Sequence, residues 1–333
     1  MHVLRCKIFF SIYHIWYNLL SYTLWSLCSS ELNISRHGGR KDIYLMTENM
    51  TKKYGFRDNI LWILALTFLL TIGGDLVSLI PINYTLFSDA YTETFNLYIT
   101  FWGIWFVFLI AILSIKDNRY ILDALKYRKN GNNLKNLVIG FGAGFVMNGA
   151  CSLTAYLHGD IKLSFAKFEL FPILLMFIAV FVQSSAEELI CRGFMYQRVL
   201  HRYSSPWVAI LVTSLFFMAL HLGNEHVSFL PLLDIFLTGL LFALMVHYFD
   251  SIWMAMACHT TWNFNQNILL GLPNSGEVSS YSILILDTKH DTNSFAYNTG
   301  FGLEGTIMSV VVMLISIAII FFAHKISEGN KSL

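Results

Sequence analysis

The stretch from Phe171 to Arg198 reads FPILLMFIAVFVQSSAEELICRGFMYQR, and it indicates the fold class of the whole chain. Its first half is almost entirely apolar, and the stretch exceeds the roughly 20 residues that an α-helix needs to cross a bilayer. Its second half nevertheless contains Glu187, Glu188 and Arg192. Ionisable side chains at membrane depth are costly and mark a functional site by default. The stretch therefore predicts a membrane-spanning helix that contributes residues to a functional site.

The composition extends this interpretation to all 333 residues. Hydrophobic residues make up 56% of the chain and charged residues 13%, where soluble domains carry about 25% charge. This composition excludes a soluble globular protein, and a net charge of +1 leaves no basic surface for nucleic acid. The five cysteines lie far apart without a CxxC pair, so neither a disulfide framework nor a thiolate zinc site is indicated.

The hydropathy pattern predicts an all-α bundle of eight membrane-spanning helices in a single domain, residues 46–333. The predicted spans are 59–81, 95–115, 137–157, 171–198, 207–222, 229–248, 251–270 and 306–324. A ninth apolar stretch, 8–28, resembles an uncleaved signal sequence or an extra N-terminal helix. Because Met46 precedes the polar run 51–58, residues 1–45 are either part of the mature chain or an upstream extension.

The distribution of the 22 Lys and Arg residues predicts the orientation of the bundle. Basic residues stay on the cytoplasmic side of a membrane, and most of them here fall in alternate loops and at the two ends of the bundle. Both ends of the eight-helix core are therefore expected to be cytoplasmic. The loop 271–305 is then the one sizeable loop on the outer side, and it shows no strong pattern of its own.

Most other ionisable residues in the spans lie near the predicted helix ends. Asp75 and Asp234 fall within about two turns of the outer surface, where snorkelling towards the headgroups is the simpler interpretation. Glu225 and His226 are placed at the outer rim by the turn that follows His221. Cys191 and Cys258 adjoin the charged motifs in the sequence but point away from them, and they are interpreted as small apolar packing residues.

Helix geometry separates the roles of the two adjacent glutamates. Residues four apart share a helix face and neighbours point about 100° apart, so Glu188 and Arg192 are expected to form a buried ion pair. Glu187 then faces elsewhere as a lone carboxylate, which suits a general base. The competing interpretation is a structural cluster of ion pairs that only holds the helices together.

The same spacing brings two further pairs of residues together. His259 and Asn263 share a face of the seventh predicted span, and Phe217 lies one turn from His221 at the end of the fifth. Taken singly, each histidine could equally be a hydrogen-bonded interior residue. Together with Glu187 they form an acid–base or metal-binding constellation that ordinary packing rarely needs.

These motifs resemble a known family when they are taken in order. Glu-Glu-x-x-x-Arg at 187–192, Phe-x-x-x-His at 217–221 and His-x-x-x-Asn at 259–263 resemble the CPBP family of intramembrane proteases. This family groups CAAX prenyl endopeptidases with bacteriocin-processing and self-immunity proteins, often called the Abi family. The resemblance covers roughly residues 170–270.

The resemblance implies an eight-helix bundle around a catalytic cavity. In it, Glu187 and His221 would activate water for attack on a peptide carbonyl, and His259 and Asn263 would stabilise the oxyanion. Glu188 and Arg192 would support the site. A zinc ion held by Glu187, His221 and His259 is one alternative, because a catalytic zinc commonly takes three protein ligands and a water. A metal-free mechanism, in which imidazole and amide groups stabilise the charge, is the other.

The predicted function is therefore an intramembrane endopeptidase that acts in a lipid bilayer on a peptide or membrane-protein substrate. A bacterial plasma-membrane enzyme that processes a bacteriocin or signalling-peptide precursor is favoured over genuine CAAX processing. The main alternative is a non-catalytic immunity or scaffold protein that uses the same cavity for binding. A proton-coupled transporter with a Glu and His relay is a third, less favoured, class.

Overall fold

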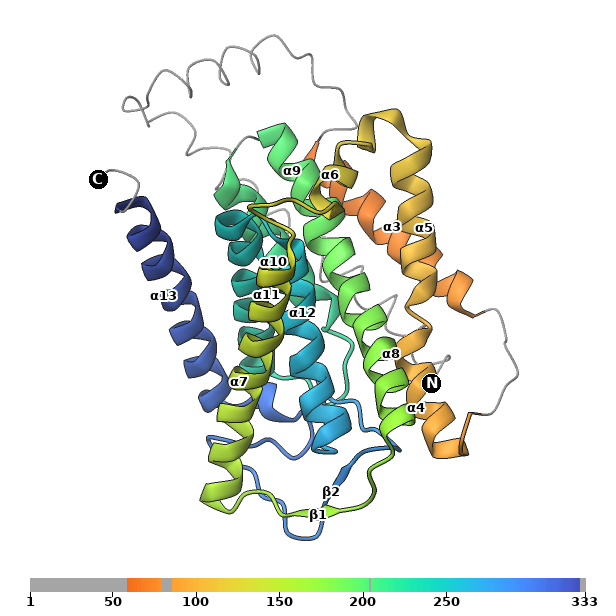
Figure 1. Cartoon of the computed structure of the whole chain (residues 1–333), viewed down its shortest axis with the longest axis vertical. Helices are drawn as coiled ribbons and strands as arrows, with labels where there is room; N and C mark the ends of the chain where they lie inside the picture. The colour runs from red at the N-terminus through yellow and green to blue at the C-terminus, as the bar shows by residue number, and fades with distance from the viewer. Residues whose placement is uncertain (1–58, 80–85, 204, 330–333) are drawn as a thin grey trace. The chain divides into compact units, whose positions relative to one another are not determined.

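The computed structural model describes residues 59–79, 86–203 and 205–329. In this part of the chain the protein is a bundle of helices with one two-stranded sheet (Figure 1). The all-α class is thereby confirmed. The N-terminal segment 1–45, with its apolar stretch 8–28, lies outside the described residues.

The first helices form one side of the bundle. Helix α3 is capped by the side chain of Asn59, which accepts a hydrogen bond from the backbone of Leu61, and α4 is capped in the same way by Ser88. Helix α3 packs against α5. The elements of this part are α3 (Ile60–Ser78), α4 (Asp89–Ile99), α5 (Trp102–Ser114), the 3₁₀ turn η2 (Lys116–Asn118) and α6 (Ile121–Leu125).

The middle of the chain contains the longest helical run. Helix α8 continues without a break through a π-helical segment, η3, into α9. The elements are α7 (Leu134–His158), β1 (Leu163–Phe165), α8 (Leu170–Glu188), η3 (Leu189–Met195) and α9 (Tyr196–Tyr203).

The last part of the chain places a second π-helical segment, η4, at the end of α12. Its elements are α10 (Pro206–Leu220), α11 (Phe229–Phe249), α12 (Ile252–Asn263), η4 (Phe264–Leu269), β2 (Leu284–Leu286), η5 (Leu303–Gly305) and α13 (Ile307–Gly329). Strand β2 pairs antiparallel with β1, with Ser164 opposite Ile285.

Each predicted span overlaps helix in the described residues, but the number of membrane crossings is not confirmed. Six helices of the described part are long and apolar enough to cross a bilayer. The fifth predicted span, α10, is a shorter apolar helix of 15 residues. The seventh, α12 with η4, is not among the six. Because nearly all side chains of α12 are buried, this helix is covered by protein and can carry polar residues.

Helix α12 lies between α7, α8 and α11, and two glycines of α7 allow its close approach (Figure 1). A side chain at Gly140 would collide with the backbone of Met254, and one at Gly144 would collide with the backbone of Cys258. Glycines four apart on one helix face permit this kind of contact between membrane helices. The position of His259, next to Cys258, therefore depends on the missing side chain at Gly144.

Helix α11 corrects one prediction about the helix ends. Asp234 is fully buried, whereas Asp75 is exposed. The prediction that Asp234 snorkels to the membrane surface is wrong. Helix α11 packs against α10, α12, α13 and the turn η5, so protein rather than lipid headgroups covers Asp234.

The loop between η4 and α13 is anchored to the bundle by a buried carboxylate. Glu304 accepts hydrogen bonds from Trp262 Nε1 at 2.9 Å and from Gln266 Nε2 at 2.6 Å. The amide oxygen of Gln266, Oε1, accepts a hydrogen bond from Asn148 Nδ2 of α7 at 2.8 Å. Buried polar groups need such partners, and this network fixes the loop against the end of α12 that carries Asn263.

Candidate active site

The pair between Glu188 and Arg192 that helix spacing predicts is present. Arg192 Nη1 donates to Glu188 Oε1 at 3.1 Å, and both side chains are fully buried. Arg192 Nη2 also donates to the backbone oxygen of Gly239 on α11 at 2.7 Å. The guanidinium lies over the rings of Phe217 and Phe242, at 4.7 and 5.5 Å from their centroids. Arg192 therefore joins α8, α10 and α11 around one buried charge.

A π-helical segment begins inside the Glu-Glu-x-x-x-Arg motif, and a second begins directly after the His-x-x-x-Asn motif. Segment η3 begins one residue after Glu188, and η4 begins one residue after Asn263. Short π-helical insertions in α-helices are rare and frequently occur at functional sites. They change the direction of the side chains that follow, and their presence at both motifs singles out this region of the bundle.

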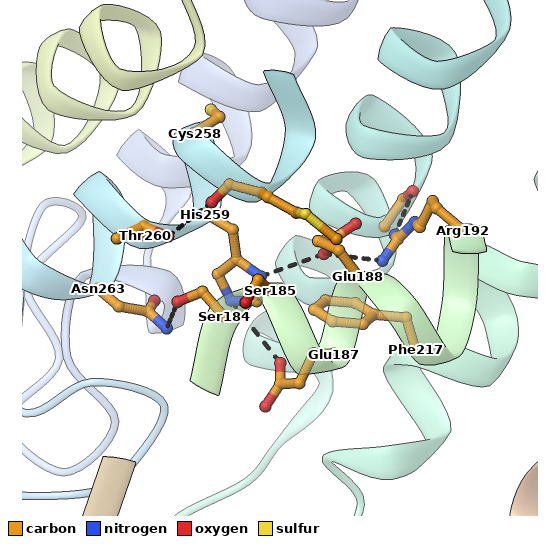
Figure 2. Close-up of polar contacts among 12 residues, drawn as sticks. Ser184, Ser185, Glu187, Glu188, Arg192, Phe217, Cys258, His259, Thr260 and Asn263 are labelled. Carbon is orange, nitrogen blue, oxygen red and sulfur yellow. Dashed lines mark hydrogen bonds and ion pairs between the residues drawn. The ribbon is translucent and has the colours of Figure 1, made fainter. Parts of the chain in front are cut away.

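His259 lies between the two glutamates. Its Nδ1 is 3.1 Å from Glu188 Oε1, and its Nε2 is 3.7 Å from Glu187 Oε2. Figure 2 shows the imidazole of α12 and both carboxylates of α8 directed towards one another. A carboxylate only accepts, so the hydrogen of the neutral ring is on Nδ1 and Nε2 is turned towards Glu187.

Glu187 is not the lone carboxylate that the sequence predicts. Its Oε1 accepts a hydrogen bond from Gln183 Nε2 at 2.6 Å, one helical turn earlier. Its Oε2 is buried and has no hydrogen-bond partner among the described residues, with His259 as its neighbour at 3.7 Å. The expectation of an unpartnered side chain is therefore wrong for one oxygen, because α8 itself supplies a polar partner on the same face.

Asn263 reaches the same helix as the glutamates. Its Nδ2 donates to Gln183 Oε1 at 3.0 Å. It also donates to Ser184 Oγ at 3.3 Å (Figure 2). Asn263 and His259 thus contact α8 from one face of α12, as their spacing predicts. Both hydrogens of the amide group are engaged within the protein, so a role as an oxyanion donor requires one of them to be exchanged for substrate.

His221 lies at the end of α10, in a backbone conformation outside the helical region with φ −98° and ψ 1°. Its Nδ1 is 2.8 Å from the backbone oxygen of Phe217. A carbonyl oxygen only accepts, so Nδ1 carries the hydrogen and Nε2 of the neutral ring is left to accept a proton.

The ring of Phe217 connects the two histidines. Its centroid is 4.9 Å from that of His221 and 5.9 Å from that of His259. Phe242 of α11 stacks on His259, with the ring centroids 5.3 Å apart. Phe217 therefore walls the site, as its position one turn from His221 predicts, and the two phenylalanines restrict the His259 imidazole to one orientation.

The predicted zinc ligands do not form a ligand set. Within residues 59–79, 86–203 and 205–329, no group of three or more His, Cys, Asp or Glu side chains is arranged to hold a metal ion. Glu187 and His259 are neighbours, and His259 Nδ1 and His221 Nδ1 bond to protein acceptors, which leaves Nε2 of each ring as the nitrogen that would bind a metal. A zinc requirement stays a prediction, and the chemistry considered below uses only the protein's own groups.

The residues predicted to lie outside the site do so. Glu225 and His226 are exposed at the rim, and His226 lines a polar surface pocket of about 540 Å³ together with residues of the loop 293–300. Cys191 and Cys258 are fully buried free thiols, in agreement with packing roles.

Four residues of the site were not singled out by the sequence. Gln183 and Ser184 bind Asn263, Gly239 binds Arg192 through its backbone, and Phe242 covers His259. The signal for Gln183 was present in the sequence, because it is a polar residue in an apolar run and stands four residues before Glu187. Phe242 and Gly239 carry no such signal, because their roles depend on how α11 packs.

Comparison with known proteins confirms the resemblance that the motifs indicate. The family model described as type II CAAX prenyl endopeptidase Rce1-like matches residues 169–265. This range contains all six predicted site residues: Glu187, Glu188, Arg192, His221, His259 and Asn263. No curated protein and no solved structure matches the chain.

Proposed function

We propose that the protein is an intramembrane endopeptidase that hydrolyses a peptide bond of a peptide or membrane-protein substrate. One observation carries the proposal: Glu187 presents a buried oxygen, Oε2, that has no hydrogen-bond partner among the described residues and faces His259. An acceptor that no protein donor occupies is what a general base needs in order to take a proton from water. The match to a prenyl endopeptidase family supports the same class of reaction.

In the proposed reaction, Glu187 Oε2 takes a proton from water while the water oxygen bonds to the peptide carbonyl carbon. The C–N bond then breaks, and the proton on Glu187 passes to the leaving nitrogen. His221 Nε2 serves as the second acceptor that orients the water, because its Nδ1 is fixed on Phe217. A positioned base contributes roughly 10²–10⁴-fold to such a step.

His259 is proposed to stabilise the oxyanion, and Asn263, whose N–H groups bond to Gln183 and Ser184, is proposed to support the site from the same helix face. In this role the imidazole is doubly protonated and donates from Nε2, while Glu188 holds Nδ1. Arg192 and Glu188 form the support that keeps the ring in place. Preorganised donors of this kind are worth about 10²–10³ in kcat each. A zinc requirement is tested by elemental analysis of the purified wild type and His259→Ala, where stoichiometric zinc lost in the variant would establish it.

The proposed location is a bacterial plasma membrane, with both ends of the helical core in the cytoplasm. A bacteriocin or signalling-peptide precursor is the favoured substrate class, and a prenylated CAAX protein is the other that the family name suggests. Two quenched fluorescent peptides of identical sequence distinguish them, one with a farnesylated C-terminal CAAX box and one without the prenyl group.

The deciding experiment compares wild type, Glu187→Ala and His221→Ala in membrane vesicles that contain each protein at equal amounts. Peptides released from the vesicle membranes are identified by mass spectrometry, alongside cleavage of the two quenched peptides. We expect cleavage by the wild type and at most residual cleavage by the variants, with unchanged membrane insertion. Equal cleavage by wild type and Glu187→Ala would reject the proposal and favour a non-catalytic binding protein.

A further inference from the structure

A chain of hydrogen bonds joins Asn263 on α12 to Glu187 on α8 through the side chain of Gln183. Asn263 Nδ2 donates to Gln183 Oε1 at 3.0 Å, and Gln183 Nε2 donates to Glu187 Oε1 at 2.6 Å. Ser184 Oγ also donates to Gln183 Oε1 at 3.0 Å. Gln183 is 8% exposed and Asn263 is 6% exposed. Bonds between such buried groups are strengthened by the weak screening around them.

The two donors on Gln183 Oε1 determine which way its amide points. Asn263 donates one N–H to this atom and Ser184 donates its O–H, so the atom that receives them must be the amide oxygen. The NH₂ group of Gln183 is thereby turned to the opposite side, where Glu187 Oε1 accepts from it. Asn263 therefore controls, through Gln183, which atom meets the glutamate.

The bond to Gln183 also distinguishes the two oxygens of Glu187. Oε1 is held by the amide, whereas Oε2 has no hydrogen-bond partner in the described part of the chain and lies 3.7 Å from His259 Nε2. Without the Gln183 bond the carboxylate could rotate and exchange its two oxygens. A catalytic group must be held within a narrow range of angles by its neighbours to act efficiently.

We propose that Gln183 is a positioning residue of this site, and that Asn263 acts on Glu187 through Gln183. The inference rests on the proposed function and deepens it, because it explains how the base is held. It also gives Asn263 a role that agrees with its contacts, because its two N–H groups donate to Gln183 and Ser184.

The test measures kcat and KM for a peptide that the wild type cleaves and Glu187→Ala does not. Gln183→Met removes the amide at similar length, and Gln183→Glu keeps its shape without the N–H donor should the methionine variant fail to insert. Ser185→Ala is the matched control, because Ser185 is a buried residue of the same turn whose hydroxyl accepts from Trp105 instead. We expect Gln183→Met to lower kcat roughly tenfold to hundredfold, as loss of a supporting partner typically does.

The division between kcat and KM separates positioning from a general loss of structure. All polar atoms of Gln183 are used within the protein, so KM should stay within about twofold for Gln183→Met. Ser185→Ala should lower the unfolding temperature while leaving kcat near that of the wild type. A Gln183→Met protein with wild-type kcat, or one in which only KM rises, would overturn the inference.

A double-mutant cycle tests the link to Asn263. If Asn263 acts through Gln183, the double variant Gln183→Met/Asn263→Ala should be no slower than the slower single variant. Penalties that multiply would show that Asn263 acts independently and would overturn this part of the inference. If the wild type is as inactive as Glu187→Ala, the proposed function itself has failed and the inference falls with it.

Discussion

His259 Nδ1 lies 3.1 Å from Glu188 Oε1, and the same oxygen accepts a hydrogen bond from Arg192 Nη1. One carboxylate oxygen therefore accepts hydrogen bonds from both a buried guanidinium and an imidazole. Because Arg192 is also fixed by the backbone of Gly239, Glu188 cannot move without breaking a buried ion pair. Glu188 and Arg192 therefore determine the orientation of the His259 ring, and with it the ring nitrogen that faces Glu187.

Replacement of Glu188 by Gln tests this support. The amide keeps the shape of the side chain but removes the charge that pairs with Arg192. We expect kcat/KM to fall roughly tenfold to hundredfold, because an imidazole without its orienting carboxylate loses its fixed ring direction. Glu225→Gln, at an exposed position, is the control and should behave as wild type. A Glu188→Gln enzyme with wild-type kcat/KM would show that the carboxylate plays no part in orienting His259.

Replacement of Arg192 by Lys tests the buried end of the same network. Arg192 bonds to Glu188 and to Gly239 while lying over Phe217, and a lysine ammonium cannot do all three. We expect a loss of about 1.5–3 kcal/mol in the free energy of unfolding, the usual value of a charged hydrogen bond. Thermal unfolding in detergent measures the change.

Arg128→Lys provides the comparison for that experiment. Arg128 pairs with Asp250 at 2.7 Å, but the two side chains are 36% and 59% exposed, whereas Arg192 and Glu188 are fully buried. Exposed ion pairs contribute about 0–1 kcal/mol, so this variant should change the unfolding temperature little. Equal losses in the two lysine variants would contradict the structural role assigned to the buried position.

Helix spacing in the sequence was sufficient to predict the contacts that are local. Glu188 with Arg192 and Phe217 with His221 are four residues apart, and such pairs meet on any helix. The partners from other helices were not predictable, because Gln183 meets Asn263 only when α8 and α12 pack in one register. Burial of Asp234 was missed for the same reason.

The number of membrane-spanning helices could also not be predicted from the sequence. The polar residues of α12 lower its hydropathy, and its burial by neighbouring helices cannot be derived from its own composition. Gly140 and Gly144, in contrast, stand four apart in the sequence, and that spacing is a recognised signal for close helix contact.

Gly144→Ala should displace α12 and with it His259. A methyl group at this position would collide with the backbone of Cys258 and the side chain of Thr261, and backbone cannot move aside cheaply. We expect lower thermal stability, by about 1–3 kcal/mol for such overpacking, and a loss of cleavage activity. Gly142→Ala is the matched control on the same helix, because a side chain there meets no atom within 4 Å. If both alanine variants retain wild-type activity, the close approach of α7 does not position His259.

The carboxyl group of Glu304 should make stability depend on pH. Burial raises the pKa of this group in the loop before α13, although hydrogen bonds from Trp262 and Gln266 oppose the shift. A carboxyl whose pKa is raised in the folded state stabilises the fold fully below its unfolded value near 4.5, and this contribution is lost as pH rises through the folded-state pKa. The wild type should therefore lose part of its unfolding free energy over the pH range above about 4.5. In Glu304→Gln this part of the slope should disappear, whereas Glu93→Gln, at an exposed position, should keep it. Unfolding temperatures measured across that range in detergent decide the matter, and identical slopes for wild type and Glu304→Gln would show that Glu304 does not carry the effect.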